Sequence, residues 1–446
     1  MNSTKEKIKN VLIGVLIVGM LYLTYAVWFY DSPFGELRFD SLFGIRNSLE
    51  VSEGAGSDLD RFGIRPLAIA VSDGAGRRGA IYKSERSDEI YTILREEISQ
   101  SIKKMKEPSA CDGTDWETAL VSQGVFMDFR SDVPVSALRL WLSGISDDKT
   151  LCGRYYIFST DKRNVRIYIK NSLDGTVYVA ETEGSSEKLR AAMEYVKSEK
   201  INFAALRTEE DFRAISPETV LSESGISLPV LSVYSPDVSI TDTAEAACLG
   251  VFGLSDVPTT KYREQDGTGV YVADRITLKI SPDGTVVYTD TREEADETLG
   301  ITVESEGDFP TLAEKTEKAR QLAAALAVNT PGEGGIYIAS VSETAAGTEI
   351  VFGRHIAGTP VDVRNSLYFT SITLKGESVR SVRAKIVGYE ATERTVPLVP
   401  EDIAAAAVRG SGRTGDLNIR YRDGGETEVS PAWYIGGIQK QGEEEK

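Results

Sequence analysis

Histidine and cysteine are nearly missing from this sequence of 446 residues, which has one histidine and three cysteines. Zinc sites and Cys-His or Ser-His-Asp centres depend on these residues, so their scarcity argues against such chemistry. His355 lies at a predicted strand end, where a surface or half-buried role is favoured over that of a catalytic base. Cys111 and Cys152 are candidates for a disulfide, although their spacing alone does not require one. Cys248, in an apolar segment, is interpreted as a small core residue.

Basic residues are in the minority: 50 Lys and Arg stand against 68 Asp and Glu, which gives a net charge of −18. Residues 1–9 carry a charge of +2 and residues 10–30 carry none, so the remainder of the chain carries −20. A field of this sign repels nucleic acids and other polyanions. Nucleic acid is therefore excluded as a partner, and a basic surface of another protein is favoured.

Long apolar runs are missing too, with one exception near the N-terminus. The run Val11–Tyr30 has no charge, and at about 1.5 Å per residue its twenty residues make about 30 Å, the thickness of a bilayer core. Lysines precede it and acids follow it, so the positive-inside rule places the N-terminus in the cytoplasm. We predict a single-pass cell-membrane protein whose bulk is extracytoplasmic. The alternative is a signal peptide cleaved near Thr24-Tyr25-Ala26.

The rest of the chain predicts an α+β fold, in which modules of antiparallel sheet are packed with helices. Helical periodicity marks the segment from Ile90 to Met105, and a helix capped by Thr311 is expected to run to about Val328, over a following antiparallel meander. Leu173-Asp174-Gly175 and Pro282-Asp283-Gly284 predict tight hairpins in similar surroundings, a weak repeat.

These patterns divide the chain into segments. A linker after the first folded segment is expected within the stretch from Ser216 to Pro229. The predicted segments are a cytoplasmic tail (1–10), the transmembrane helix (11–30), a stalk (31–60), an N-terminal α+β domain (61–215), a middle β-rich module (216–305), a C-terminal α+β module (306–438) and a disordered tail (439–446).

The motifs that could carry chemistry are weak. Gly74–Gly79 matches a dinucleotide-binding loop, but the helix that must open at its third glycine starts several residues later, so a hairpin or loop is favoured. Acidic pairs such as Glu96-Glu97, Glu209-Glu210-Asp211 and Glu293-Glu294 are expected on solvated faces, with a glycosidase pair as the alternative. No catalytic, cofactor-binding or metal residue is predicted, and no cofactor.

Two stretches carry a resemblance to a known family. The strand pair Asp266–Tyr271 and Ile280–Thr285 around an Asp-Gly turn, and the ending Val429–Ile435 with its Pro-Ala-Trp strand, resemble the YycH/YycI family of extracytoplasmic regulators. The size and the anchor are similar to the longer YycH type. The resemblance implies PepSY-like modules in the C-terminal part and no catalytic residues. It also implies a non-enzymatic restraint on a cell-wall sensor histidine kinase of Gram-positive bacteria, in a membrane complex that can include a homologous accessory subunit.

The predicted function is therefore that of a membrane-anchored accessory regulator of a two-component system. Gly19, Tyr22 and Ala26 fall on one face of the predicted transmembrane helix, where two small residues allow a partner helix to approach closely. These three residues are the candidate partner contact, and the alternative is that they face lipid. Two other functions stay open: an anchored envelope hydrolase that uses carboxylates, and an inhibitor or chaperone-like binding module for a protease.

Overall fold

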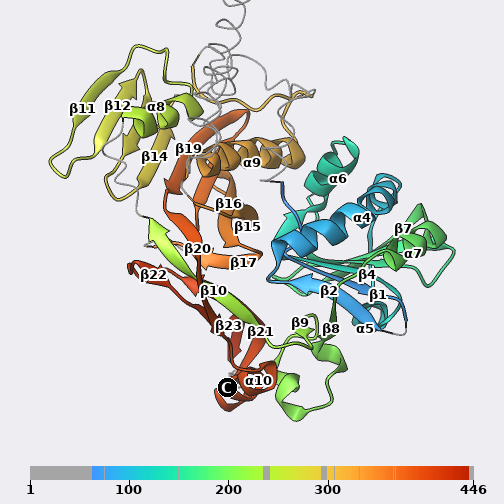
Figure 1. The fold of residues 1–446 in the computed structure, drawn as a ribbon. Coiled ribbons are helices and arrows are strands. Elements are labelled where there is room, and N and C mark those ends of the chain that lie inside the picture. Colours follow the sequence, from blue (N-terminus) through green and yellow to red (C-terminus); the bar gives the residue numbers. More distant parts are fainter. Residues whose placement is uncertain are drawn as a thin grey trace, which may run out of the picture. The chain divides into compact units, whose positions relative to one another are not determined.

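The computed structural model describes residues 63–74, 76–147, 150–234, 242–292, 299–305, 307–330, 332–364, 366 and 368–440 (Figure 1). The predicted cytoplasmic tail, transmembrane helix and stalk and the last six residues lie outside the described residues. Within the described ranges no helix is long and apolar enough to cross a membrane. The fold is α+β with antiparallel sheets, as predicted.

A nine-stranded antiparallel sheet forms the first part of the fold, in the order β3-β7-β6-β5-β4-β1-β2-β8-β9. Its strands are β1 (Ala68–Ser72), β2 (Arg77–Ile81), β3 (Ser109–Ala110), β4 (Gly124–Pro134), β5 (Cys152–Ser159), β6 (Asn164–Lys170), β7 (Val177–Ser185), β8 (Glu199–Phe203) and β9 (Val220–Ser222). The glycine-rich segment joins β1 to β2 as a hairpin, which confirms that prediction over the dinucleotide-binding loop.

Helices cover both faces of this sheet because its central strands are apolar on both sides. Alternate residues of β1 enter two different clusters: Ile69 and Val71 pack with one set of helices, Ala68 and Ala70 with the other. The first set is α4 (Ser84–Lys103), α6 (Val135–Ser143) and α7 (Ser186–Glu194), and the other side holds α5 (Gly113–Val121) (Figure 1). Helix α4 starts at Ser84, six residues before the apolar periodicity that marks it in the sequence, and Ser87 is buried within its first turn.

The second large sheet has eleven strands, in the order β11-β12-β13-β14-β19-β18-β16-β17-β21-β23, with β15 paired to β16. Its strands are β11 (Thr260–Arg263), β12 (Gly269–Ala273), β13 (Ile276–Ile280), β14 (Thr285–Asp290), β15 (Gly335–Thr344), β16 (Gly347–Ile356), β17 (Thr359–Asp362), β18 (Thr370–Lys375), β19 (Ser378–Lys385), β21 (Arg413–Arg422) and β23 (Pro431–Lys440). All neighbours are antiparallel except β17 and β21.

Most of this sheet is built from two similar units. Helix α8 (Asp242–Val251) precedes the four-stranded meander β11 to β14, and helix α9 (Leu312–Val328) precedes β15, β16, β18 and β19. The units join through their last strands, β14 and β19, which pair antiparallel. The repeat in the structure is thus this helix-plus-meander unit, larger than the Asp-Gly hairpin noted in the sequence. The predicted boundary at residue 305 falls between the two units, and the sheet continues across it.

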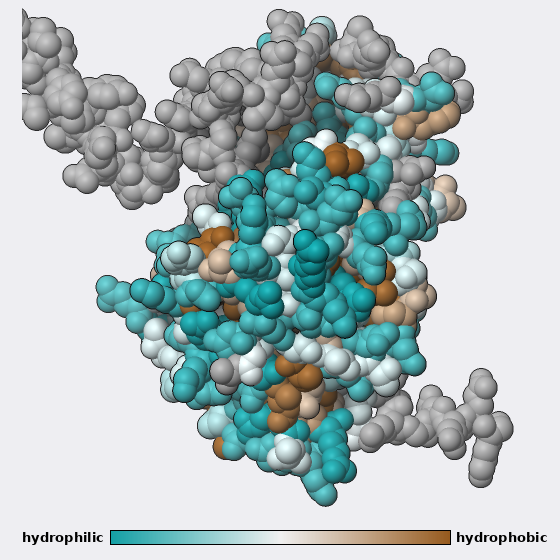
Figure 2. Space-filling view, turned by 90° about the vertical axis from the view of Figure 1, so that its right-hand side faces the viewer, coloured by the Kyte–Doolittle hydropathy of each residue, from teal (hydrophilic) through white to brown (hydrophobic). Residues whose placement is uncertain are grey.

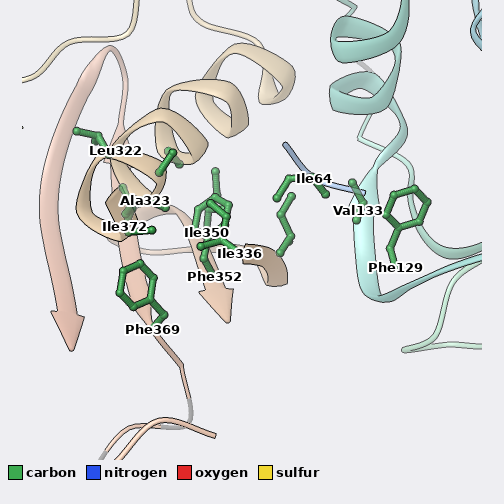
Figure 3. Packing of buried hydrophobic residues seen from close by; sticks show 14 of the residues in the cluster. Ile64, Phe129, Val133, Leu322, Ala323, Ile336, Ile350, Phe352, Phe369 and Ile372 are labelled. Carbon is green, nitrogen blue, oxygen red and sulfur yellow. The ribbon is translucent and has the colours of Figure 1, made fainter. Parts of the chain in front are cut away.

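Helix α9 is held over the second unit by a cap and an apolar face. Thr311 and Glu314 form a reciprocal capping box, which confirms that Thr311 caps this helix. Leu322 and Ala323 of the helix belong to one apolar cluster with Ile336 and Ile350 of the strands below (Figure 3). The same cluster continues to residues of the first sheet, including Phe129 and Val133, so one apolar core joins the two sheets.

The third sheet of the fold has three strands, in the order β20-β10-β22. It consists of β10 (Ser227–Tyr234), β20 (Gly388–Pro397) and β22 (Glu428–Val429), and nearby lie α10 (Glu401–Gly410) and the short 3-10 helices η1 (Ala204–Leu206) and η2 (Glu210–Ala214). The segment expected to be a linker, 216–229, therefore carries strand β9 and part of β10, and its Glu218 is buried against Trp116. All three cysteines are free.

Candidate functional site

The predicted contact residues Gly19, Tyr22 and Ala26 lie outside the described residues, so their role stays a prediction. Within the described part, the candidate site consists of buried charged side chains. No group of three or more His, Cys, Asp or Glu side chains among the described residues is placed to hold a metal ion. His355 lies near the end of β16, accepts a hydrogen bond at Nδ1 from the Gly358 N–H, and has a pKa lowered to about 4 by burial and by Arg354.

Four charged residues form what we call the charge cluster: Asp128, Arg130 and Arg154, whose side chains are largely buried, and the half-buried Asp416. Asp128 on β4 accepts two hydrogen bonds from Arg154 on β5, from Nε at 2.8 Å and from Nη2 at 3.1 Å. It also accepts the Arg130 backbone N–H at 2.7 Å and forms an ion pair with the Arg130 guanidinium at 3.2 Å. The side chains of Asp128 and Arg130 are 4% and 7% exposed. The carboxylate is thus fully engaged on the first sheet.

The cluster reaches the second sheet through β21. Arg154 Nη1 donates to Asp416, and the Tyr155 hydroxyl donates to the same carboxylate at 3.2 Å. A few residues further along β21, the Ile419 N–H donates to the Tyr82 hydroxyl oxygen at 2.8 Å. Arg130 lies over the Tyr82 ring, 5.5 Å from its centre. Two charges of each sign therefore balance where the N-terminal sheet meets β21.

The protonation states in the cluster are held by its own charges. Burial by itself would raise the pKa of Asp128, but Arg154 and Arg130 bring that pKa below its ordinary value. The Asp128 and Asp416 charges keep the pKa of Arg154 well above its ordinary value despite burial. Burial raises the pKa of Tyr155 well above its ordinary value. Asp128 therefore stays ionised, Arg154 stays protonated and Tyr155 stays neutral near neutral pH. The arrangement is suited to hold β21 against the first sheet. It does not favour acid-base catalysis.

Shallow depressions lined by charges of both signs lie on the surface of the described residues. One, of about 360 Å³, is lined by Lys106, Asp115, Arg166 and Tyr168 among others, and the second, of about 460 Å³, includes Arg190. Seen from the right of Figure 1, the surface is mostly hydrophilic and its hydrophobic residues form small separate areas (Figure 2). Glu96 and Glu209, members of the acidic pairs, are exposed.

Glu401, in the described part of the chain, has a pKa near neutral pH. It is the first residue of α10, and its carboxylate accepts the Ser222 N–H at 2.8 Å, which ties α10 to β9. Burial raises its pKa from 4.5 to about 7. Because the folded chain holds this proton more tightly than the unfolded chain, the contribution of Glu401 to stability is present at low pH and is lost as pH rises from about 4.5 through 7.

We therefore expect Glu401→Gln to stabilise the protein at pH 8 by about 1 kcal/mol and to change little at pH 5, because the amide keeps the acceptor without the buried charge. The measurement is the thermal unfolding midpoint of the full chain at both values. Glu393→Gln, at an exposed position of β20, is the matched control. Equal shifts of the midpoint at pH 5 and pH 8 would contradict the expectation.

Sequence reasoning missed the charge cluster, although the sequence holds a signal for it. Arg154 opens the apolar run Tyr155–Phe158, and Asp128 interrupts the apolar strand from Val125 to Phe129. A charge inside a strand that is buried on both faces requires a partner, because an unpaired buried ion is costly. The partner Asp416 lies 262 residues from Arg154, and nothing in the spacing points to it.

Comparisons with known proteins support the architecture. No protein-family model matches the chain, and no curated protein matches it in sequence. Among solved structures, YycH from Bacillus subtilis is similar, with a TM-score of 0.50 and 10% sequence identity, over 84% of this chain and 95% of that one. The prediction of a YycH-like fold from the two sequence motifs is confirmed, and the described structure has the fold of YycH from Bacillus subtilis.

Proposed function

We propose that this protein is a membrane-anchored, non-enzymatic regulator that restrains a cell-wall sensor histidine kinase by direct protein contact. The observation that carries the proposal is the YycH-like fold, which extends over 84% of the chain. The sequence resemblance to the YycH/YycI family implies the same role and a partner kinase, with a homologous accessory subunit as a further member of the complex. Residues 11–30 anchor the chain with the N-terminus in the cytoplasm and the folded part outside.

The proposal is tested by reconstitution. The full chain with a purification tag is isolated from solubilised membranes, and the sensor kinase that co-purifies with it is identified. The kinase is then placed in proteoliposomes either alone or together with the full chain. We expect lower autophosphorylation when the chain is present. An unchanged kinase rate, or co-purification with a peptidase in place of a kinase, would overturn the proposal.

The transmembrane contact has its own test. Gly19→Leu combined with Ala26→Leu is expected to weaken association with the kinase in a membrane two-hybrid assay several-fold, because bulk at two small positions keeps a partner helix from approaching closely. Ile17→Leu with Thr24→Leu alters the opposite helix face and is the control. Unchanged association in the Gly19→Leu, Ala26→Leu variant would show that Gly19 and Ala26 face lipid.

A further inference from the structure

Helix α10 has an apolar outer face that is exposed in the described part of the chain. The residues of its inner face are buried against η2 and β21: Ala404, Ala405 and Val408. Four exposed residues lie on the opposite face, and we call them the outer stripe: Ile403, Ala406, Ala407 and Gly410. Residues at these spacings of three and four lie on one side of a helix, so the stripe is continuous.

This composition is unusual for an exposed helix face, which is ordinarily polar or charged. The exposed positions of α4 are polar throughout, and among them are Arg86, Glu89 and Glu96. The alanines of α10 by themselves would be explained by their high helix propensity. Ile403 is not, and it is 55% exposed, as Val399 just before the helix is 52% exposed. Large apolar side chains exposed so close together indicate a surface that another molecule covers.

The outer stripe is complementary to itself. Its centre lies between Ala406 and Ala407, which is where a two-fold axis would relate two antiparallel copies of the helix. In such a pair, Ile403 of each copy lies opposite Gly410 of the other. The largest side chain of the stripe then meets the residue that has none, and the alanines meet at the centre. Small residues at a helix contact let the two helix axes lie close together.

The charges beside the stripe fit the same arrangement. Asp402, in the first turn of α10, and Arg413, just after its end, are both exposed. An antiparallel partner brings Asp402 of each copy toward Arg413 of the other, so the attraction occurs twice in the pair. Arg409 already pairs with Glu210 and Asp211 of its own chain. A parallel partner would instead bring like charges together, which is unfavourable.

We propose that the outer stripe is the contact surface for a second copy of this chain, with the two α10 helices antiparallel. Residues 441–446, which follow β23, have no apolar side chain with which to cover it. A helix of 10 residues buries much less than the about 800 Å² per partner of a standard interface, so the pair should be weak in dilute solution. On a membrane, where the proposed anchor places the chain, neighbouring copies are concentrated and a weak contact suffices. The contact is independent of the proposed kinase contact.

Oxidative cross-linking of the full chain in proteoliposomes tests the pairing. Position 406 lies beside the two-fold axis, and a disulfide requires Cα atoms within about 7 Å of each other. Ala406→Cys should therefore give a disulfide-linked dimer in a yield about tenfold or more above that of the parent, whose three free cysteines set the background. Glu96→Cys, at an exposed position of α4, is the matched control and should stay at the background.

Further changes in the Ala406→Cys variant decide the arrangement. Ile403→Glu should lower the yield about tenfold, because it places a charge against Gly410 of the other copy. Asp402→Arg or Arg413→Asp alone should lower the yield about fivefold, since each change turns two attractions into repulsions. The two reversals together should restore the yield, because the antiparallel pair joins these two positions. Restored pairing also shows that the reversed residues leave the fold intact.

Equal yields from Ala406→Cys and Glu96→Cys would overturn the proposal, because the stripe would then not meet its counterpart. A yield that Ile403→Glu leaves unchanged would mean that the copies are joined elsewhere, for example through their membrane helices. Failure of the double reversal to restore the yield would overturn the antiparallel arrangement. A cross-link from Ala406→Cys to a different protein in native membranes, with none between copies in proteoliposomes, would assign the stripe to another partner.

Discussion

Asp128→Asn is expected to destabilise the protein by about 3–5 kcal/mol, because it leaves two buried guanidinium groups with one carboxylate between them. The two bonds from Arg154 to Oδ1 and Oδ2 would no longer be charge-assisted, and Arg130 would lose its ion pair with Asp128. The measurement is the midpoint of chemical or thermal unfolding of the full chain at neutral pH. The loss should be similar from pH 6 to pH 8, since the pKa of Asp128 is held below its ordinary value.

Asp211→Asn is the matched control for this result. Asp211 pairs with Arg409 at 3.0 Å, but those side chains are 39% and 50% exposed. An exposed pair of this kind contributes about 1 kcal/mol or less. A loss at Asp128 no larger than the loss at Asp211 would show that water reaches the charge cluster and that burial does not set its strength.

Gly284→Ala is the second change with a large expected effect. Gly284 forms the β13–β14 hairpin turn with φ of +83°, and a Cβ placed there would lie 2.3 Å from the Ile386 carbonyl oxygen. The neighbouring backbone cannot move away easily, because the Ile386 N–H donates to the Gly284 carbonyl at 2.8 Å. We expect a loss of about 3 kcal/mol or more, from the backbone clash and the left-handed conformation together. Differential scanning calorimetry would measure it.

The β18–β19 hairpin provides the control for this substitution. Gly376 also has a left-handed backbone, with φ of +58°, but a Cβ there would meet no atom within 4 Å. Gly376→Ala should therefore cost only the conformational part, about 1 kcal/mol. If both alanine variants lost the same stability, the close approach of the Gly284 turn to the Ile386 carbonyl would not be what requires glycine at position 284.

Features set by neighbouring residues could be predicted from the sequence. The hairpin at Pro282-Asp283-Gly284, the cap at Thr311 and the apolar stripe of α4 all depend on side chains within a few positions of one another, and the structure contains each of them. The pairing of β14 with β19 could not be predicted, because many strands of the chain have the same alternating pattern and would pair equally well.

The candidate site was beyond sequence reasoning for the same physical reason. A buried charge signals that a partner exists, but it does not say where in the chain the partner is. The carboxylate that completes the cluster comes from β21, near the C-terminus, and it is brought to Arg154 only by the packing of the two sheets. Tyr82 contributes through a backbone conformation for which its residue type gives no hint.

The joining of the two helix-plus-meander units through β14 and β19 has a consequence for assembly. Two like subunits that meet through equivalent edge strands would form a symmetric dimer, and here both lie on one polypeptide. In a dimer of separate chains both copies are identical, and the dimer dissociates when the protein concentration falls. On one chain the partner is always present, so each half is free to diverge: α8 has 10 residues and α9 has 17. The asymmetry leaves one half to meet the first sheet and the other to change independently.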